Sequence, residues 1–159
     1  MKFRTNILWP WFALLSLLFG LSVHADDDAE ESRFTADNAT WRAECGSCHL
    51  AYPPALLAAR DWRQIMHQLD RHYGSDATLD TAQLTQIGTF LESNAGHSAA
   101  AETKDLPRIT LSPWFKREHR EVPARVWKSS AVRSAANCGA CHRQAHSGDF
   151  SEESLQLPR

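Results

Sequence analysis

Two stretches, ECGSCH at residues 44–49 and NCGACH at residues 137–142, contain all four cysteines of this 159-residue chain. Both repeat the frame C-G-x-C-H, in which two residues separate the cysteines and a histidine follows. This frame is compatible with three chemistries: a redox-active disulfide, a zinc site, and the covalent attachment of a c-type haem. The rest of the sequence has to distinguish among them.

The first 25 residues have the layout of a secretory signal peptide. Lys2 and Arg4 form a basic start, an apolar run covers residues 7–23, and small residues precede a cluster of acids. Cleavage is expected after Ala25. An uncleaved membrane anchor is disfavoured, because polar residues, glycine and proline interrupt a run that falls short of about 20 apolar residues. We therefore expect an exported, soluble protein with no transmembrane segment after cleavage.

Charge and composition divide the remaining chain. Without residues 1–25 it has 15 basic and 19 acidic residues, a formal charge of −4, which argues against a nucleic-acid partner. We expect an acidic, disordered lead-in at 26–36, an N-terminal lobe at 37–96, a linker at 97–106 and a C-terminal lobe at 107–159. Each lobe contains one C-x-x-C-H motif. A lobe this small rarely forms a sufficient core unaided, so a disulfide, metal or cofactor should stabilise it.

The haem interpretation agrees best with the motifs. A redox-active disulfide would need alternating strands and helices, and no convincing strand pattern is present. A zinc site is disfavoured because a histidine adjacent to the second cysteine cannot easily fold back onto the metal, and zinc usually needs a second pair of ligands. In a c-type haem, one helical turn presents both thiols to the porphyrin and the following imidazole binds the iron. The sequence thus predicts two covalent haems, with these cysteines and proximal iron ligands: Cys45, Cys48, Cys138, Cys141, His49 and His142.

The segments before the motifs predict attachment helices. Asp37 or Asn38 can cap a helix that brings Trp41 one turn before the first motif. In the second half, Ser129 or Ser130 can cap a similar helix that leads into residues 137–142.

A candidate for the sixth iron ligand follows the first motif. Apolar residues recur at helical spacing between Trp62 and Tyr73, and Gly74 is a typical helix stop. On this helix His72 lies at the edge of the apolar face, whereas His67 points toward solvent. His72 is therefore the leading candidate, with Met66 as its rival.

Two more helices are predicted. One covers the stretch from Asp80 or Thr81 to about Asn94. In the second half, Ser112 and Pro113 begin a helix on which Phe115 and His119 share a face. This half has no methionine, so His119 is the leading sixth ligand there.

The other candidates in the second half are weaker. Lys116 and Lys128 are poor alternatives to an imidazole. His146 follows the proximal His142 by four residues, so it should emerge on the same side of the haem. We interpret His146 as a surface residue.

Four stretches together resemble the bacterial dihaem cytochrome c family: WRAECGSCHLAYPPALL (41–57), DWRQIMHQLDRHYG (61–74), RITLSPWFKREH (108–119) and AANCGACHRQAHSGDF (135–150). The resemblance implies a periplasmic electron carrier with two low-spin haems, each with paired histidine ligands. By motif, the distal ligands are His72 and His119, and which of them serves which haem stays open. It also implies redox partners, such as a small oxygen-binding monohaem cytochrome c and a membrane-bound b-type cytochrome.

We therefore expect a mostly α-helical protein of two small cytochrome c-like lobes, each organised around one covalently bound haem with its iron. The expected function is electron transfer, and the protein is not expected to be an enzyme. An enzyme of the peroxidase or oxyanion-reductase type would need one five-coordinate haem beside acid–base groups, but the charged residues around His119 fit a solvated face more simply. A haem-based sensor would need a signalling domain, and the sequence indicates none.

Overall fold

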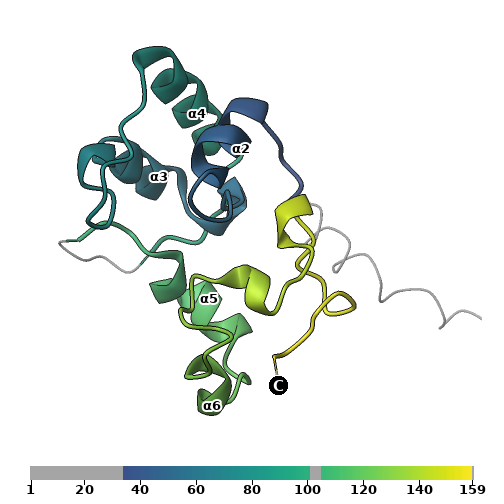
Figure 1. Cartoon of the computed structure of the whole chain (residues 1–159). Coiled ribbons are helices and arrows are strands. Elements are labelled where there is room, and N and C mark those ends of the chain that lie inside the picture. The colour runs from purple at the N-terminus through teal and green to yellow at the C-terminus, as the bar shows by residue number, and fades with distance from the viewer. Residues whose placement is uncertain (1–33, 101–104, 159) are drawn as a thin grey trace, which may run out of the picture.

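The computed structural model describes residues 34–100 and 105–158, and within them it is mostly helical, as predicted (Figure 1). The α-helices are α2 (Ala39–Gly46), α3 (Ala59–Met66), α4 (Thr81–Ser93), α5 (Pro113–Glu118) and α6 (Ala124–Trp127). Short 3₁₀ helices connect them: η1 (Pro54–Leu56), η2 (Leu69–Arg71), η3 (Ile109–Leu111), η4 (Cys138–Ala140) and η5 (Ala145–Ser147). Extended pairing in the described residues is limited to isolated bridges. In Figure 1, α2, α3 and α4 gather in one lobe, and α5 and α6 lie in the other.

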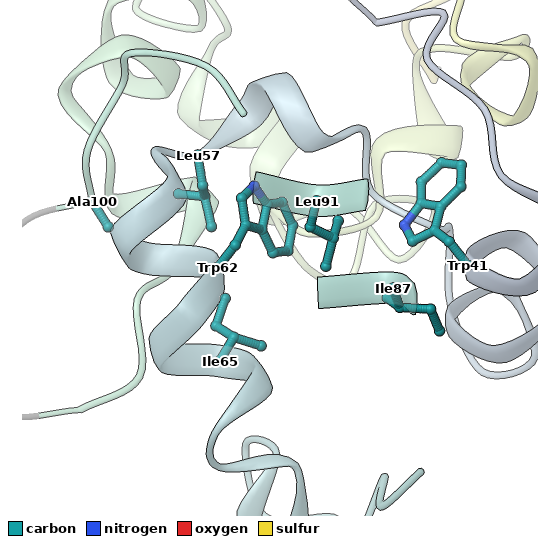
Figure 2. Close-up of a cluster of buried hydrophobic side chains, with 7 residues drawn as sticks. All are labelled: Trp41, Leu57, Trp62, Ile65, Ile87, Leu91 and Ala100. Carbon is teal, nitrogen blue, oxygen red and sulfur yellow. The ribbon is translucent and has the colours of Figure 1, made fainter. Parts of the chain in front are cut away.

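The N-terminal lobe has an apolar core between α2, α3 and α4. Trp62 and Ile65 on α3 face Ile87 and Leu91 on α4, and Trp41 from α2 closes the cluster (Figure 2). These residues follow the i, i+3 and i, i+4 spacing that places side chains on one helix face. All of them are at least nine-tenths buried. The lobe thus contains a packed core in addition to its haem motif.

The predicted helix starts are confirmed where polar side chains cap the backbone. The Asn38 side chain accepts from Trp41 N, and Asp80 forms a capping box with Gln83. In the second lobe the Ser112 hydroxyl accepts from Phe115 N at 3.1 Å, and this serine has no exposed surface. These caps fix where α2, α4 and α5 begin.

The C-terminal lobe has a much smaller apolar core. Its buried cluster consists of Val126, Val132 and Ala140, and its helices α5 and α6 have six and four residues. So few apolar side chains bury little surface, and short helices gain most of their stability from packing. The stability of this lobe should therefore depend strongly on the group that is bound at its motif.

Part of the expected lead-in is packed between the lobes. Phe34, within the expected segment 26–36, is buried with Ala55 and Leu56. Its ring lies 6.0 Å from that of Trp114 and 5.1 Å from that of Phe150, between centroids. The folded part of the chain thus includes Phe34. The expected signal peptide and the rest of the lead-in lie outside the described residues.

The expected linker at 97–106 is also partly packed. Ser98 accepts from Ala58 N at 3.1 Å, and the buried Asp61 carboxylate accepts from Ala100 N at 2.7 Å. These bonds attach the start of the segment to α3, and residues 101–104 lie outside the described part of the chain. In the part that is described, no helix is long and apolar enough to cross a membrane.

One predicted helix is shorter than expected, and another does not form. The first ends at Met66, and the chain continues through η2 into a turn where Tyr73 and Gly74 have φ of 49° and 97°. The second, expected from Ser129 or Ser130 into the motif, is replaced by turns and by η4. There the Asn137 side chain donates to Val132 O, and Arg133 has φ of 62°. Side-chain bonds of this kind compete with helical ones.

Candidate functional site

The first C-x-x-C-H motif lies at the end of α2. Cys45, in the last turn of the helix, packs against the N-terminal core, whereas Cys48 and His49 are exposed. Burial, and secondarily the charge of Glu44, raises the pKa of the Cys45 thiol to about 11. A neutral thioether fits this position better than a thiolate would.

His72 lies opposite the first motif. It follows η2, and its ring centroid is 6.1 Å from that of His49, with the two ring planes 18° apart. His49 Nδ1 lies 2.6 Å from the carbonyl oxygen of Leu50. Because a carbonyl can only accept, Nδ1 carries the proton and Nε2 of the neutral ring keeps a free lone pair. Burial, followed by the nearby His49, lowers the pKa of His72, which favours the neutral ring that binds metals.

The second motif has a similar arrangement on shorter elements. Cys138 begins η4, and Cys141 and His142 follow it half-buried. Burial raises the pKa of Cys138 to about 11 and also raises that of Cys141. The pKa of His142 is lowered by burial and then by His119, so its ring also favours the neutral form.

His119 completes the second pair from the end of α5. Its ring centroid lies 6.1 Å from that of His142, with the planes 77° apart. His119 Nδ1 lies 2.9 Å from Phe115 O, which again leaves Nε2 unprotonated in the neutral ring. The ring also stacks on Phe115, the partner predicted from their four-residue spacing, at 4.0 Å between centroids.

The spacing of both pairs suits a metal between two imidazoles. A metal–nitrogen bond of about 2.0–2.1 Å, with the nitrogen roughly 1.1 Å from the ring centre, would place two opposite rings roughly 6.3 Å apart. Both pairs measure 6.1 Å. The Nδ1 atoms of His72 and His142 are buried with no hydrogen-bond partner among the described residues. These four histidines and four cysteines therefore fit two haems of the c type.

The rival ligands lie elsewhere. Met66 packs against the N-terminal apolar cluster, as a core side chain does. His67, Lys116, Lys128 and His146 are exposed. The structure thus brings together the predicted histidines and places none of these alternatives in either ring pair.

Two tyrosines contact the first histidine pair from outside, and these contacts were not predicted from the sequence. The Tyr52 ring stacks on His49 at 4.8 Å and 21°, and the Tyr73 ring meets His72 edge-on at 4.8 Å. Burial is the main cause that raises the pKa of Tyr52 to about 12. The sequence did indicate that these tyrosines could contact the site, because the chain has only two tyrosines and each lies within three residues of a candidate ligand.

A family model for dihaem cytochrome c matches residues 41–150, which include both motifs and both histidine pairs. The chain belongs to the dihaem cytochrome c family. Solved structures agree. A dihaem cytochrome c from Rhodobacter sphaeroides is 42% identical, with a TM-score of 0.63, covering 73% of this chain and 98% of the other. One from Shewanella baltica is 37% identical, with a TM-score of 0.68, covering 76% and 93%. No curated protein matches.

Family membership confirms the predicted cofactors. The protein is a dihaem c-type cytochrome with two covalently bound, iron-containing haem c groups, and the resemblance seen in the sequence is confirmed. The same membership selects haem over the disulfide and zinc alternatives for the two motifs. The mostly helical, two-lobed fold is also confirmed.

Proposed function

We propose that this cytochrome transfers electrons between redox proteins through two haems, each ligated by two histidines. The observation that carries the proposal is the pairing of His49 with His72 and of His119 with His142, each at 6.1 Å between ring centroids. The pairing also supports ligation within each lobe, because the His72 ring lies opposite that of His49 and the His119 ring lies opposite that of His142.

The side chains around each pair suit electron transfer. When bound, haem iron supplies a one-electron cycle between Fe(III) and Fe(II). The Nδ1 protons of His49 and His119 are held by backbone carbonyls, which orients the rings and makes Nε2 a stronger ligand. Two imidazoles per iron leave no open position for a substrate. They also lack the methionine that raises the potential of many cytochromes c, so both potentials should lie lower.

We further propose that the protein works in the periplasm. The support is the predicted signal peptide at residues 1–25 and the covalent haem attachment of the family. Its partners, by the sequence resemblance, would be redox proteins, such as a small oxygen-binding monohaem cytochrome c and a membrane-bound b-type cytochrome.

Carbon monoxide binding combined with redox titration tests this proposal. The reduced holoprotein should keep its low-spin spectrum under carbon monoxide, and a potentiometric titration should show two one-electron steps. Binding of carbon monoxide to one haem of the unmodified protein would instead support the five-coordinate, enzymatic alternative.

A further inference from the structure

Tyr52 contacts both haem-binding regions. Its ring stacks on His49, the predicted proximal ligand of the first haem, at 4.8 Å and 21°. Its hydroxyl donates to the carbonyl oxygen of Ala136 at 2.8 Å, across 84 positions of sequence. Ala136 lies two residues before Cys138, the first cysteine of the second motif. One side chain therefore links an axial histidine of one lobe to the attachment segment of the other.

The surroundings of Tyr52 hold it in place. The half-buried ring packs against the N-terminal core and also against the Phe34 cluster that joins the lobes. The Cys138 Sγ lies 3.7 Å from the same Ala136 oxygen that accepts the hydrogen bond from the Tyr52 hydroxyl. The hydroxyl thus approaches the second motif at the cysteine itself.

Tyr73 offers an internal comparison. It also contacts a candidate ligand, His72, and its hydroxyl also donates to the backbone beyond residue 100, at Pro107. Pro107, however, lies in the segment that enters η3, 31 positions before Cys138. Both tyrosines therefore connect the lobes by a hydrogen bond. Of the two, only Tyr52 bonds to the segment directly before the second haem motif.

We propose that Tyr52 is the positioning residue that couples the two haem sites, and that its hydrogen bond to Ala136 sets the rate of electron exchange between them. The bond holds the second motif against the first axial histidine. It also completes a route for the electron between His49 and Cys138. The route consists of the stack of Tyr52 on His49, the hydrogen bond to Ala136 and the short backbone from Ala136 to Cys138. In each exchange one electron leaves a ferrous haem and arrives at a ferric one, while Tyr52 keeps its proton and is not oxidised. This inference rests on the proposed electron-transfer function.

The Tyr52→Phe variant of the full holoprotein isolates the hydroxyl. Phenylalanine keeps the ring that stacks on His49, so both haems should stay low-spin and six-coordinate. The exchange rate between the haems should fall, because the route loses its hydrogen-bonded step from Tyr52 to the carbonyl oxygen of Ala136. Tyr73→Phe is the matched control, because it removes a hydroxyl that makes the other hydrogen bond between the lobes.

Laser-flash reduction measures the rate. A flavin semiquinone radical, generated in less than one equivalent, reduces the haem that reacts faster, and the electron then redistributes within the chain. The redistribution phase is independent of protein concentration, which separates it from reactions between molecules. Its rate should fall in Tyr52→Phe and stay close to wild type in Tyr73→Phe.

Two outcomes would overturn the inference. One is an unchanged redistribution rate in Tyr52→Phe with both haems six-coordinate. The other is equal slowing by Tyr73→Phe, because general loosening between the lobes would then control the rate. Both outcomes are distinguishable from failure of the proposed electron-transfer function, because that failure would appear as carbon monoxide binding by the wild-type protein.

Discussion

Replacing His119 with alanine tests the ligand assignment of the second lobe. The His119 ring faces His142 at 6.1 Å and is held by Phe115, through stacking at 4.0 Å and a 2.9 Å hydrogen bond. Without it, the second haem should change from six- to five-coordinate. The first haem should stay low-spin, because His49 and His72 belong to the other lobe.

The structure sets the size of this effect. One of the two ring pairs is broken, so the reduced variant should bind one carbon monoxide per chain, whereas wild type should bind none. The variant should still fold, because Cys138, Cys141 and His142 would continue to hold the second haem. Added imidazole should occupy the vacated position and restore the low-spin spectrum. Absorption titration with carbon monoxide, before and after imidazole, measures both effects.

His146→Ala is the control. The His146 side chain is exposed on η5 and belongs to neither ring pair, so its removal should leave both haems closed. Should His146→Ala open a haem while His119→Ala leaves both closed, the assignment of the second pair is wrong.

Three further predictions concern stability. Ser112→Ala removes the buried cap of the helix that presents His119, so it should lower the free energy of unfolding of the C-terminal lobe by about 1–2 kcal/mol. Denaturant titrations should show no such change in the second lobe for the matched cap variant Asn38→Ala. Replacing both Cys138 and Cys141 with alanine should unfold the C-terminal lobe yet preserve most helical circular dichroism, because α2, α3 and α4 have 8, 8 and 13 residues; a loss of most of this signal would contradict the independent N-terminal core. Hydrogen bonds from Ser151, first from its backbone, lower the pKa of Asp149 below 3.8. The stability that Asp149 adds relative to Asp149→Ala should therefore be present above pH 3.8 and be lost as the pH falls through the folded pKa. The measurement is the free energy of unfolding of both proteins as a function of pH. A difference between the two proteins that is the same at every pH would refute this.

The sequence was informative where local chemistry determines structure. The C-x-x-C-H motifs specify their cofactor through adjacent residues, and the Asp80 and Ser112 caps act on backbone groups only three residues away. The stacking of His119 on Phe115 also follows from spacing along one helix. Each of these features depends on residues that are neighbours in the sequence.

Features that depend on distant residues could not be predicted in this way. The helix expected before the second motif does not form, because the Asn137 side chain donates a hydrogen bond to the carbonyl oxygen of Val132. The spacing of apolar residues does not predict such a side-chain bond. The hydrogen bond between Tyr52 and Ala136 joins residues 84 positions apart. The burial of Phe34, in a segment that composition assigns to disorder, likewise requires partners from both lobes.

Electron paramagnetic resonance of the fully oxidised protein tests the central claim most directly. Parallel imidazole planes act mainly on one iron d orbital and give a rhombic low-spin signal, whereas perpendicular planes leave two d orbitals nearly equal in energy and give a more anisotropic one. The planes are 18° apart in the first pair and 77° apart in the second. We therefore predict two low-spin signals of equal intensity, one rhombic and one highly anisotropic. A high-spin signal from half or more of the iron would contradict two bis-histidine haems.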